Sequence, residues 1–186
     1  ISGIIIGTIG ATEQAAHQIA LSCASFTFMV SMGLAQGSSI RVSNAFGLRN
    51  RLKITTIGKS TLITALLYGT LCAVIFISLR NILPVAFNEN TDVIRMAALL
   101  LIYAAVFQIS DATQAIAAGL LRGIKDVKTP TLFIGIAYWV VGIPAGYYLA
   151  FNAGLGAVGI WIGFIVGLSC SSILLCYRFL RMAKKV

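Results

Sequence analysis

The stretch MAALLLIYAAVFQISDATQAIAAGLL, residues 96–121, is predominantly apolar and contains one acidic residue, Asp111. Because a helix rises about 1.5 Å per residue, the stretch is long enough to cross the ~30 Å hydrocarbon core of a bilayer. Asp111 would then lie about 16 Å from the next charged residue, Arg122, and therefore near the midplane. A carboxylate at that depth costs roughly 2.5 to 3.5 kcal/mol and needs a partner, a proton, a cation or a wet cavity. Asp111 is therefore the first candidate for a functional residue.

The composition is that of an integral membrane protein. Hydrophobic residues make up 59% of the 186 residues and charged residues only 10%, a balance that soluble domains of this size do not have. The formal net charge is +9, but the basic residues fall in short segments between apolar stretches, where lysine and arginine set the orientation of a membrane protein. We therefore expect the chain to contact the lipid bilayer and not nucleic acid.

Five stretches are long enough to cross a bilayer as helices, and they predict an all-α, polytopic membrane bundle. They cover about residues 15–40, 61–79, 96–121, 131–150 and 155–177, and residues 1–10 are interpreted as the end of a sixth helix. Basic residues are concentrated after the first, third and fifth of these stretches. By the positive-inside rule those segments are cytoplasmic, so the C-terminus is expected inside the cell. The segment 41–59 is long enough to hold a short interfacial helix.

The residue pattern predicts neither an enzyme nor a bound cofactor. No Ser/His/Asp set, histidine-rich metal spacing or pair of carboxylates occurs at one depth. The four cysteines lie within or at the end of apolar stretches, without disulfide or zinc spacing, so we expect them to be packing residues. Residues 154–159 fit the spacing GxGxxG, but no strand precedes them, and we expect an external turn there.

Two helix faces are too polar to lie against lipid. On the first span, polar side chains and methionines recur at helical spacing. They are Gln18, Ser22, Ser25, Met29, Met32 and Gln36. The second face surrounds Asp111 and includes Phe107, Gln108 and Gln114. Such faces either form hydrogen bonds between helices or line a cavity. No basic residue lies at the depth of Asp111, which favours an ion or substrate path over a buried structural acid.

Glycines spaced four residues apart predict close helix packing, because they let two backbones approach each other. The sets are Gly33 with Gly37, Gly142 with Gly146, and Gly159 with Gly163 and Gly167. Pro144 should bend the fourth span near Tyr138 and Trp139. His17, at the external end of the first span, is expected to cap the helix or pack rather than to carry a proton.

Several short motifs occur in a fixed order through nearly the whole chain. They are AHQI (16–19), FMV (28–30), SIRV (39–42), QISDA (108–112), GLLRG (119–123), KD (125–126), YW (138–139) with Pro144, and GIWIG (159–163). Each motif is weak alone, but the ordered set resembles the multidrug and toxic compound extrusion (MATE) family. The chain is similar to the second lobe of a twelve-helix exporter, from the end of helix seven through helix twelve.

This resemblance implies two six-helix lobes in a V and a multi-pass antiporter of the inner (plasma) membrane. Such a protein would export cationic drugs or other organic compounds in exchange for Na⁺ or H⁺, with no further cofactor. Asp111 matches the helix-ten carboxylate of the second-lobe cation site, where it could bind Na⁺, with Phe107 and Gln108 beside it. The expected substrate contacts are Gln18, Ser22, Phe28, Met29 and Gln114.

Some positions depart from the family pattern, and two alternatives stay open. Phe107 stands where a tyrosine is common, and Ser31 replaces a frequent proline. The acid of helix seven and the whole first lobe would precede Ile1, so we expect the chain to be part of a longer polypeptide. The first alternative is a lipid-linked oligosaccharide flippase of the same superfamily, although no span has a central Lys or Arg. The second is a non-transporting membrane subunit whose polar faces only bind partner helices.

Overall fold

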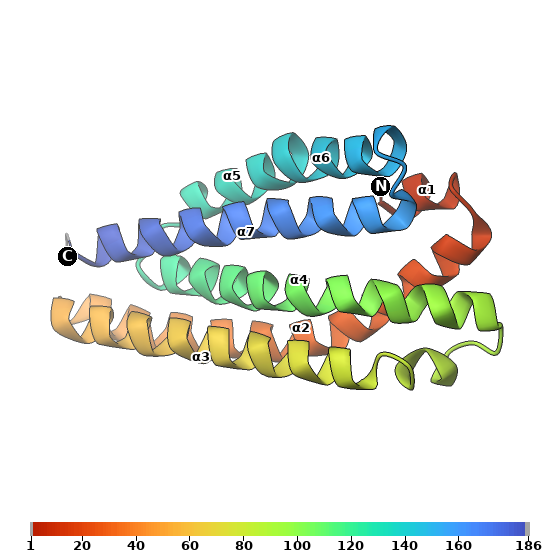
Figure 1. Ribbon diagram of the computed structural model, residues 1–186. Coiled ribbons are helices and arrows are strands. Elements are labelled where there is room, and N and C mark those ends of the chain that lie inside the picture. Colours follow the sequence, from red (N-terminus) through yellow and green to blue (C-terminus); the bar gives the residue numbers. More distant parts are fainter. Residues whose placement is uncertain (1, 185–186) are drawn as a thin grey trace.

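The computed structural model describes residues 2–184, which form an elongated bundle of long helices (Figure 1). Within these residues, five helices are long and apolar enough to cross a membrane. They are α2 (Ala11–Gly47), α3 (Arg51–Leu79), α4 (Thr91–Gly123), the irregular helix Lys128–Asn152, and α7 (Gly156–Ala183). The short helix α1 (Ser2–Gly7) precedes them. The predicted all-α membrane bundle with five spanning helices is confirmed.

The helices extend beyond the apolar stretches from which they were predicted, most clearly around the turn between α2 and α3. The prediction of an interfacial helix in residues 41–59 is wrong, because α2 continues to Gly47 and α3 begins at Arg51. Asn50 caps α3 by accepting a hydrogen bond from the Lys53 backbone N–H at 3.0 Å. Long basic side chains extend past the apolar core to reach water, so a charged residue does not end a membrane helix.

All three basic segments lie at one end of the bundle, which we call the basic end (Figure 1). They are the α2–α3 turn, the turn between α4 and α5 (Lys128–Ile136), and the C-terminal part of α7. At the opposite end, the loop before α4 holds the short 3-10 helix η1 (Leu83–Ala86), and Asn90 caps α4 by accepting from the Asp92 N–H at 2.9 Å. The two ends therefore differ in charge as a membrane topology requires.

The fourth spanning helix is not a regular α-helix. α5 is followed by the π-helical segment η2 (Ala137–Gly142), by α6 (Ile143–Tyr147) and by the π-helical segment η3 (Tyr148–Asn152). Pro144 lies in the first turn of α6 and has no N–H to donate to the preceding turn. The distortion expected at Pro144 thus takes the form of π-helical turns, which also lie at Tyr138 and Trp139.

Close backbone contacts hold this irregular helix against α7. A Cβ added at Gly163 would lie 2.4 Å from the Cα of Gly146 and 2.6 Å from the carbonyl oxygen of Gly142. The packing predicted for these glycines is therefore present. Gly33 and Gly37 differ, because no atom of another helix within residues 2–184 lies within 4 Å of a Cβ added at either. The prediction that this pair packs against another helix is wrong for the described part of the chain.

Helix α4 is the centre of the bundle and packs against α2, α3 and α7. The apolar core around it is divided in two. One cluster, with Ile6, Leu100 and Trp161, fills the opposite end, and the other, with Leu120 and Phe179, fills the basic end. Between them, at mid-length, lies a central polar layer. Its members are Thr27, Ser31, Tyr68, Gln108, Ser110, Asp111, Gln114, Ser169, Ser171 and Ser172.

Candidate functional site

Asp111 lies in the central polar layer on α4, and its side chain is only 8% exposed. Among residues 2–184, no hydrogen bond or ion pair involves its carboxylate, and the one ion pair is formed elsewhere, between Arg178 and Asp126 at 2.9 Å. A buried acid without a partner is costly unless a proton, a cation or water reaches it. Two cavities provide such access.

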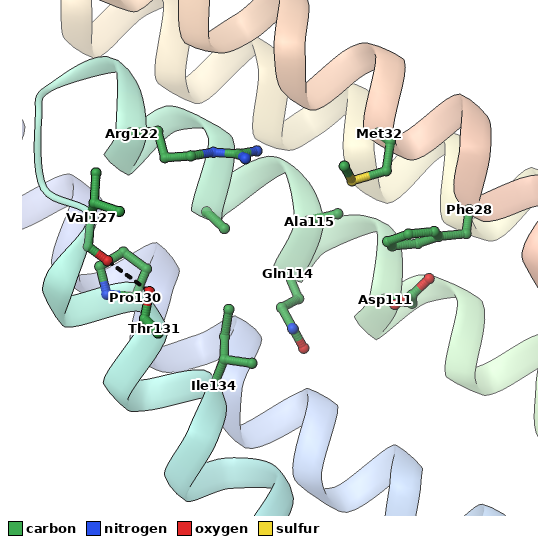
Figure 2. A pocket seen from close by; sticks show the side chains of 11 residues that line it. Phe28, Met32, Asp111, Gln114, Ala115, Arg122, Val127, Pro130, Thr131 and Ile134 are labelled. Carbon is green, nitrogen blue, oxygen red and sulfur yellow. Dashed lines mark hydrogen bonds between the residues drawn. The ribbon is translucent and has the colours of Figure 1, made fainter.

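The first cavity, which we call the basic-side cavity, has a volume of about 330 Å³ and is bordered by α2, α4 and α5 (Figure 2). Its lining is largely apolar with a few polar groups, as is usual for sites that bind small molecules. The lining residues are Phe28, Met32, Asp111, Gln114, Ala115, Ala118, Arg122, Val127, Pro130, Thr131 and Ile134. Asp111 lies at one end of this set along α4 and Arg122 at the other.

The second cavity, which we call the opposite-side cavity, has a volume of about 190 Å³ and is lined by Leu21, Ala24, Ser25, Phe28, Phe107 and Asp111. Helices α2 and α4 both run from the opposite end to the basic end (Figure 1). The two cavities therefore lie on opposite sides of one level, that of Phe28 and Asp111. These two residues alone line both cavities, and Figure 2 shows the Phe28 ring beside the Asp111 carboxylate.

One further unpaired oxygen lies in the basic-side cavity. Gln114, one helical turn along α4, lines this cavity, and its buried Oε1 has no hydrogen-bond partner within residues 2–184. Hard cations take several oxygen ligands. In the described residues, no three His, Cys, Asp or Glu side chains lie close enough together to hold a metal ion, so an ion at Asp111 would need amide, carbonyl, hydroxyl or water oxygens as well.

Gln108 and Phe107 have structural contacts of their own. Gln108 is buried, lines neither cavity around Asp111, and donates through Nε2 to Thr27 Oγ1 on α2. Tyr68 on α3 donates to the Thr27 carbonyl at 2.8 Å. This network ties α2, α3 and α4 together. Phe107 lines the opposite-side cavity and packs edge-on against Trp161, with ring centroids 5.6 Å apart.

The polar stripe predicted on α2 only partly faces these cavities. Ser25 and Met32 line them. Gln18, Ser22 and Met29 do not: the Ser22 hydroxyl donates to the Gln18 carbonyl at 2.9 Å, and Met29 is 74% exposed. The face of α2 toward Asp111 is instead centred on Phe28. Substrate contacts by Gln18, Ser22 and Met29 stay predictions.

The sequence did not single out the α5 wall of the basic-side cavity, which is formed by Pro130, Thr131 and Ile134. These residues carry no polar pattern, and only the packing of α5 beside α4 brings them to the site. Arg122 was interpreted as an orientation signal alone. His17 packs as expected: it is 1% exposed, its ring centroid lies 5.8 Å from that of Trp161, and neither ring nitrogen has a hydrogen-bond partner in the described part of the chain.

The family model MatE matches residues 1–148 of the chain. The chain belongs to the MATE family. MATE proteins are membrane transporters and not enzymes, so the resemblance noted from the ordered motifs is confirmed.

Solved structures agree in fold. The crystal structure of the eukaryotic MATE transporter AtDTX14 is 23% identical, with a TM-score of 0.86 over 94% of this chain and 40% of that protein. An inward-facing multidrug resistance MATE family transporter of the MOP superfamily is 17% identical, with a TM-score of 0.87 over 95% of this chain and 40% of that protein. A MOP superfamily transporter from Pyrococcus furiosus is 17% identical, with a TM-score of 0.84 over 95% of this chain and 39% of that protein. The MATE chain therefore spans about 40% of the length of these transporters.

Proposed function

We propose that this chain is the second lobe of an antiporter that exports organic cations in exchange for Na⁺ or H⁺. Asp111 is the group for which the organic cation and the coupling ion compete. The missing part of the protein is a first lobe of the same polypeptide, which closes the cavities that α2 borders.

The observation that carries the proposal is the position of Asp111 between two cavities, without a fixed partner in the described chain. A structural acid would be held by a neighbouring donor, because an unpaired carboxylate in an apolar bundle is costly. An exchanging acid must instead be reachable, in turn, from each side of the membrane. The two cavities supply those routes within one lobe.

The exchange follows from a single negative charge that binds one cation at a time. When a proton or sodium ion occupies Asp111, the organic cation loses its ionic contact and leaves, and the reverse step releases the ion. Gln114 supplies a further oxygen to either cation, and Phe28 supplies an aromatic ring face to an organic one. Rocking of one lobe against the other would open one cavity while closing the other.

The distribution of charge between the two ends of the bundle gives the direction of drug transport across the membrane. We place the basic end in the cytoplasm by the positive-inside rule, so the basic-side cavity opens toward the cytoplasm and the C-terminus is cytoplasmic. A drug would therefore enter from the cell through the basic-side cavity. The membrane of this proposal is the plasma membrane, where extrusion removes the compound from the cell.

The test is exchange by the full-length protein in lipid vesicles, with Asp111→Asn compared with Asp92→Asn. Asp92 is an exposed acid at the opposite end of the same helix and lines neither cavity. We expect Asp111→Asn to abolish the efflux of an organic cation driven by a pH or sodium gradient, and Asp92→Asn to keep it. Gradient-driven efflux at the wild-type rate in Asp111→Asn would overturn the proposal, and a wild-type protein that exchanges nothing would favour the non-transporting subunit.

A further inference from the structure

A second charged side chain lines the cavity that contains Asp111. Arg122 lies eleven residues along α4, close to a whole number of helical turns, so both residues lie on the same face of the helix. Helical side chains lean back toward the N-terminus of their helix, which directs Arg122 along the cavity toward Asp111. Figure 2 shows its side chain extending from the last turn of α4 toward the side where Met32 lies.

Nothing in the described chain neutralises Arg122. Residues 2–184 contain all five acidic residues, and three of them, Glu13, Glu89 and Asp92, lie at the opposite end of the bundle. The fourth, Asp126, is held by Arg178 at 2.9 Å. The fifth is Asp111 itself, about 16 Å away along the helix axis. Arg122 therefore has no fixed counter-ion among these residues.

The positive-inside rule explains a basic residue at this level but not the direction of its side chain. Lys125 and Lys128 are close in the sequence and satisfy the same rule, yet neither lines the basic-side cavity. Arginine also differs from lysine in its planar fork of donors, which matches a carboxylate or phosphate with two hydrogen bonds. The feature to be explained is thus an exposed arginine without a fixed counter-ion at the edge of a cavity whose other end holds an acid.

The surface between the two charges is apolar. Ala115 and Ala118 form the floor on α4, and they are small enough to leave a continuous passage between Asp111 and Arg122. Met32 on α2 and Pro130 and Ile134 on α5 form the walls. After allowing for the reach of the arginine side chain, roughly 10 Å separates the carboxylate from the guanidinium.

We propose that the basic-side cavity binds zwitterionic amphiphiles, with a cationic group at Asp111, an apolar middle over Ala115 and Ala118, and an anionic group at Arg122. The proposal rests on the proposed export function and narrows its substrate class. Arg122 is the residue that selects zwitterions over simple cations. A compound with only a positive charge binds in the Asp111 half of the cavity and makes no contact with Arg122.

The test uses two compounds that differ in one charge. The first is a rigid biphenyl with a trimethylammoniomethyl group and a carboxylate in opposite para positions, and the second is its methyl ester. Their dissociation constants are measured by calorimetry on the purified full-length protein, in wild type, Arg122→Gln and Arg122→Lys. Lys125→Gln is the matched control, because it removes a positive charge at the same end without touching the cavity.

We expect Arg122→Gln to weaken binding of the carboxylate about tenfold, the usual loss for one charge-assisted contact, and to change binding of the ester less than about twofold. Arg122→Lys should keep part of the affinity for the carboxylate, and Lys125→Gln all of it. Unchanged binding of the ester also shows that the variants are folded. Equal effects on both compounds, or none on either, would overturn the proposal.

Three further outcomes distinguish the reasons for which the test could fail. If Arg122→Gln changes binding only in the presence of anionic lipid, and equally for both compounds, then the arginine binds a lipid headgroup and this inference is wrong. If the wild-type protein binds the ester but does not distinguish the carboxylate from it, the zwitterion site is wrong while cation export stands. If the wild-type protein binds neither compound, both proposals fail.

Discussion

The contact between α6 and α7 gives a prediction whose size can be worked from the structure. A Cβ at Gly163 would lie 2.4 Å from the Cα of Gly146 and 2.6 Å from its backbone nitrogen. Carbon atoms in good contact lie about 3.5 to 4 Å apart, so Gly163→Ala requires the two helices to separate by about 1 Å. The obstructing atoms are backbone, so no side-chain rotation can relieve the clash.

Overpacking of this kind costs about 1–3 kcal/mol, and the higher helix propensity of alanine returns up to about 1 kcal/mol. We therefore expect Gly163→Ala to lower the free energy of unfolding by about 1–2 kcal/mol. The matched control is Gly135→Ala on α5, where an added Cβ meets no atom within 4 Å; it should be neutral or stabilising. Thermal unfolding of the detergent-solubilised full-length protein measures both. A Gly163→Ala variant as stable as wild type would refute the close contact.

Three more substitutions test the arrangement around the site. Phe28→Ala should join the two cavities and let ions leak without substrate in vesicle flux assays, whereas Phe26→Ala should not, because that ring is 75% exposed and lines neither cavity; equal leak in both variants would contradict the separating role of Phe28. Burial tends to raise the pKa of Asp126, but the hydrogen bond and charge of Arg178 hold that pKa below its usual value; stability from this pair is present above about pH 4 and is lost as the pH falls through the lowered pKa. Asp126→Asn should therefore cost about 0.5–1 kcal/mol at neutral pH, with the difference from wild type disappearing in acid unfolding curves, and a difference that persists there would count against it. Gln108→Leu should lower the unfolding temperature by breaking the buried hydrogen bond between α4 and α2, at a cost of about 1 kcal/mol, while organic-cation affinity stays unchanged; the opposite pattern would support the predicted role of Gln108 as a coupling residue.

Much of the fold follows from the sequence, because apolar length and the placement of basic residues are local signals. The same signals underestimated the lengths of the helices. Arg41 and Lys59 ended the apolar stretches but not the helices, since such side chains reach water from inside a helix end. The pair Gly33 and Gly37 has the same spacing as Gly142 and Gly146, yet only the second pair meets a helix in the described chain. Spacing shows that a close approach is allowed, not that a partner is present.

The sequence likewise predicted one part of the candidate site and missed another. Asp111 was identified because its cost in a membrane depends on depth alone, which the sequence gives. The rotation of α2 about its own axis depends on packing against α3 and α4, so the predicted stripe includes Ser25 and Met32 but misses the face centred on Phe28. The α5 wall depends on how the chain turns at residues 124–127, for which the sequence carries no periodic signal.

The central claim is that an organic cation and the coupling ion compete for the Asp111 carboxylate. The most direct measurement is the dissociation constant of tetraphenylphosphonium for the purified full-length protein, determined over a range of pH and of sodium concentration. The account predicts that affinity in the wild type falls as the proton or sodium concentration rises, and that Asp111→Asn loses this dependence. A wild-type affinity that is independent of both ions, or a dependence that is unchanged in Asp111→Asn, would contradict it.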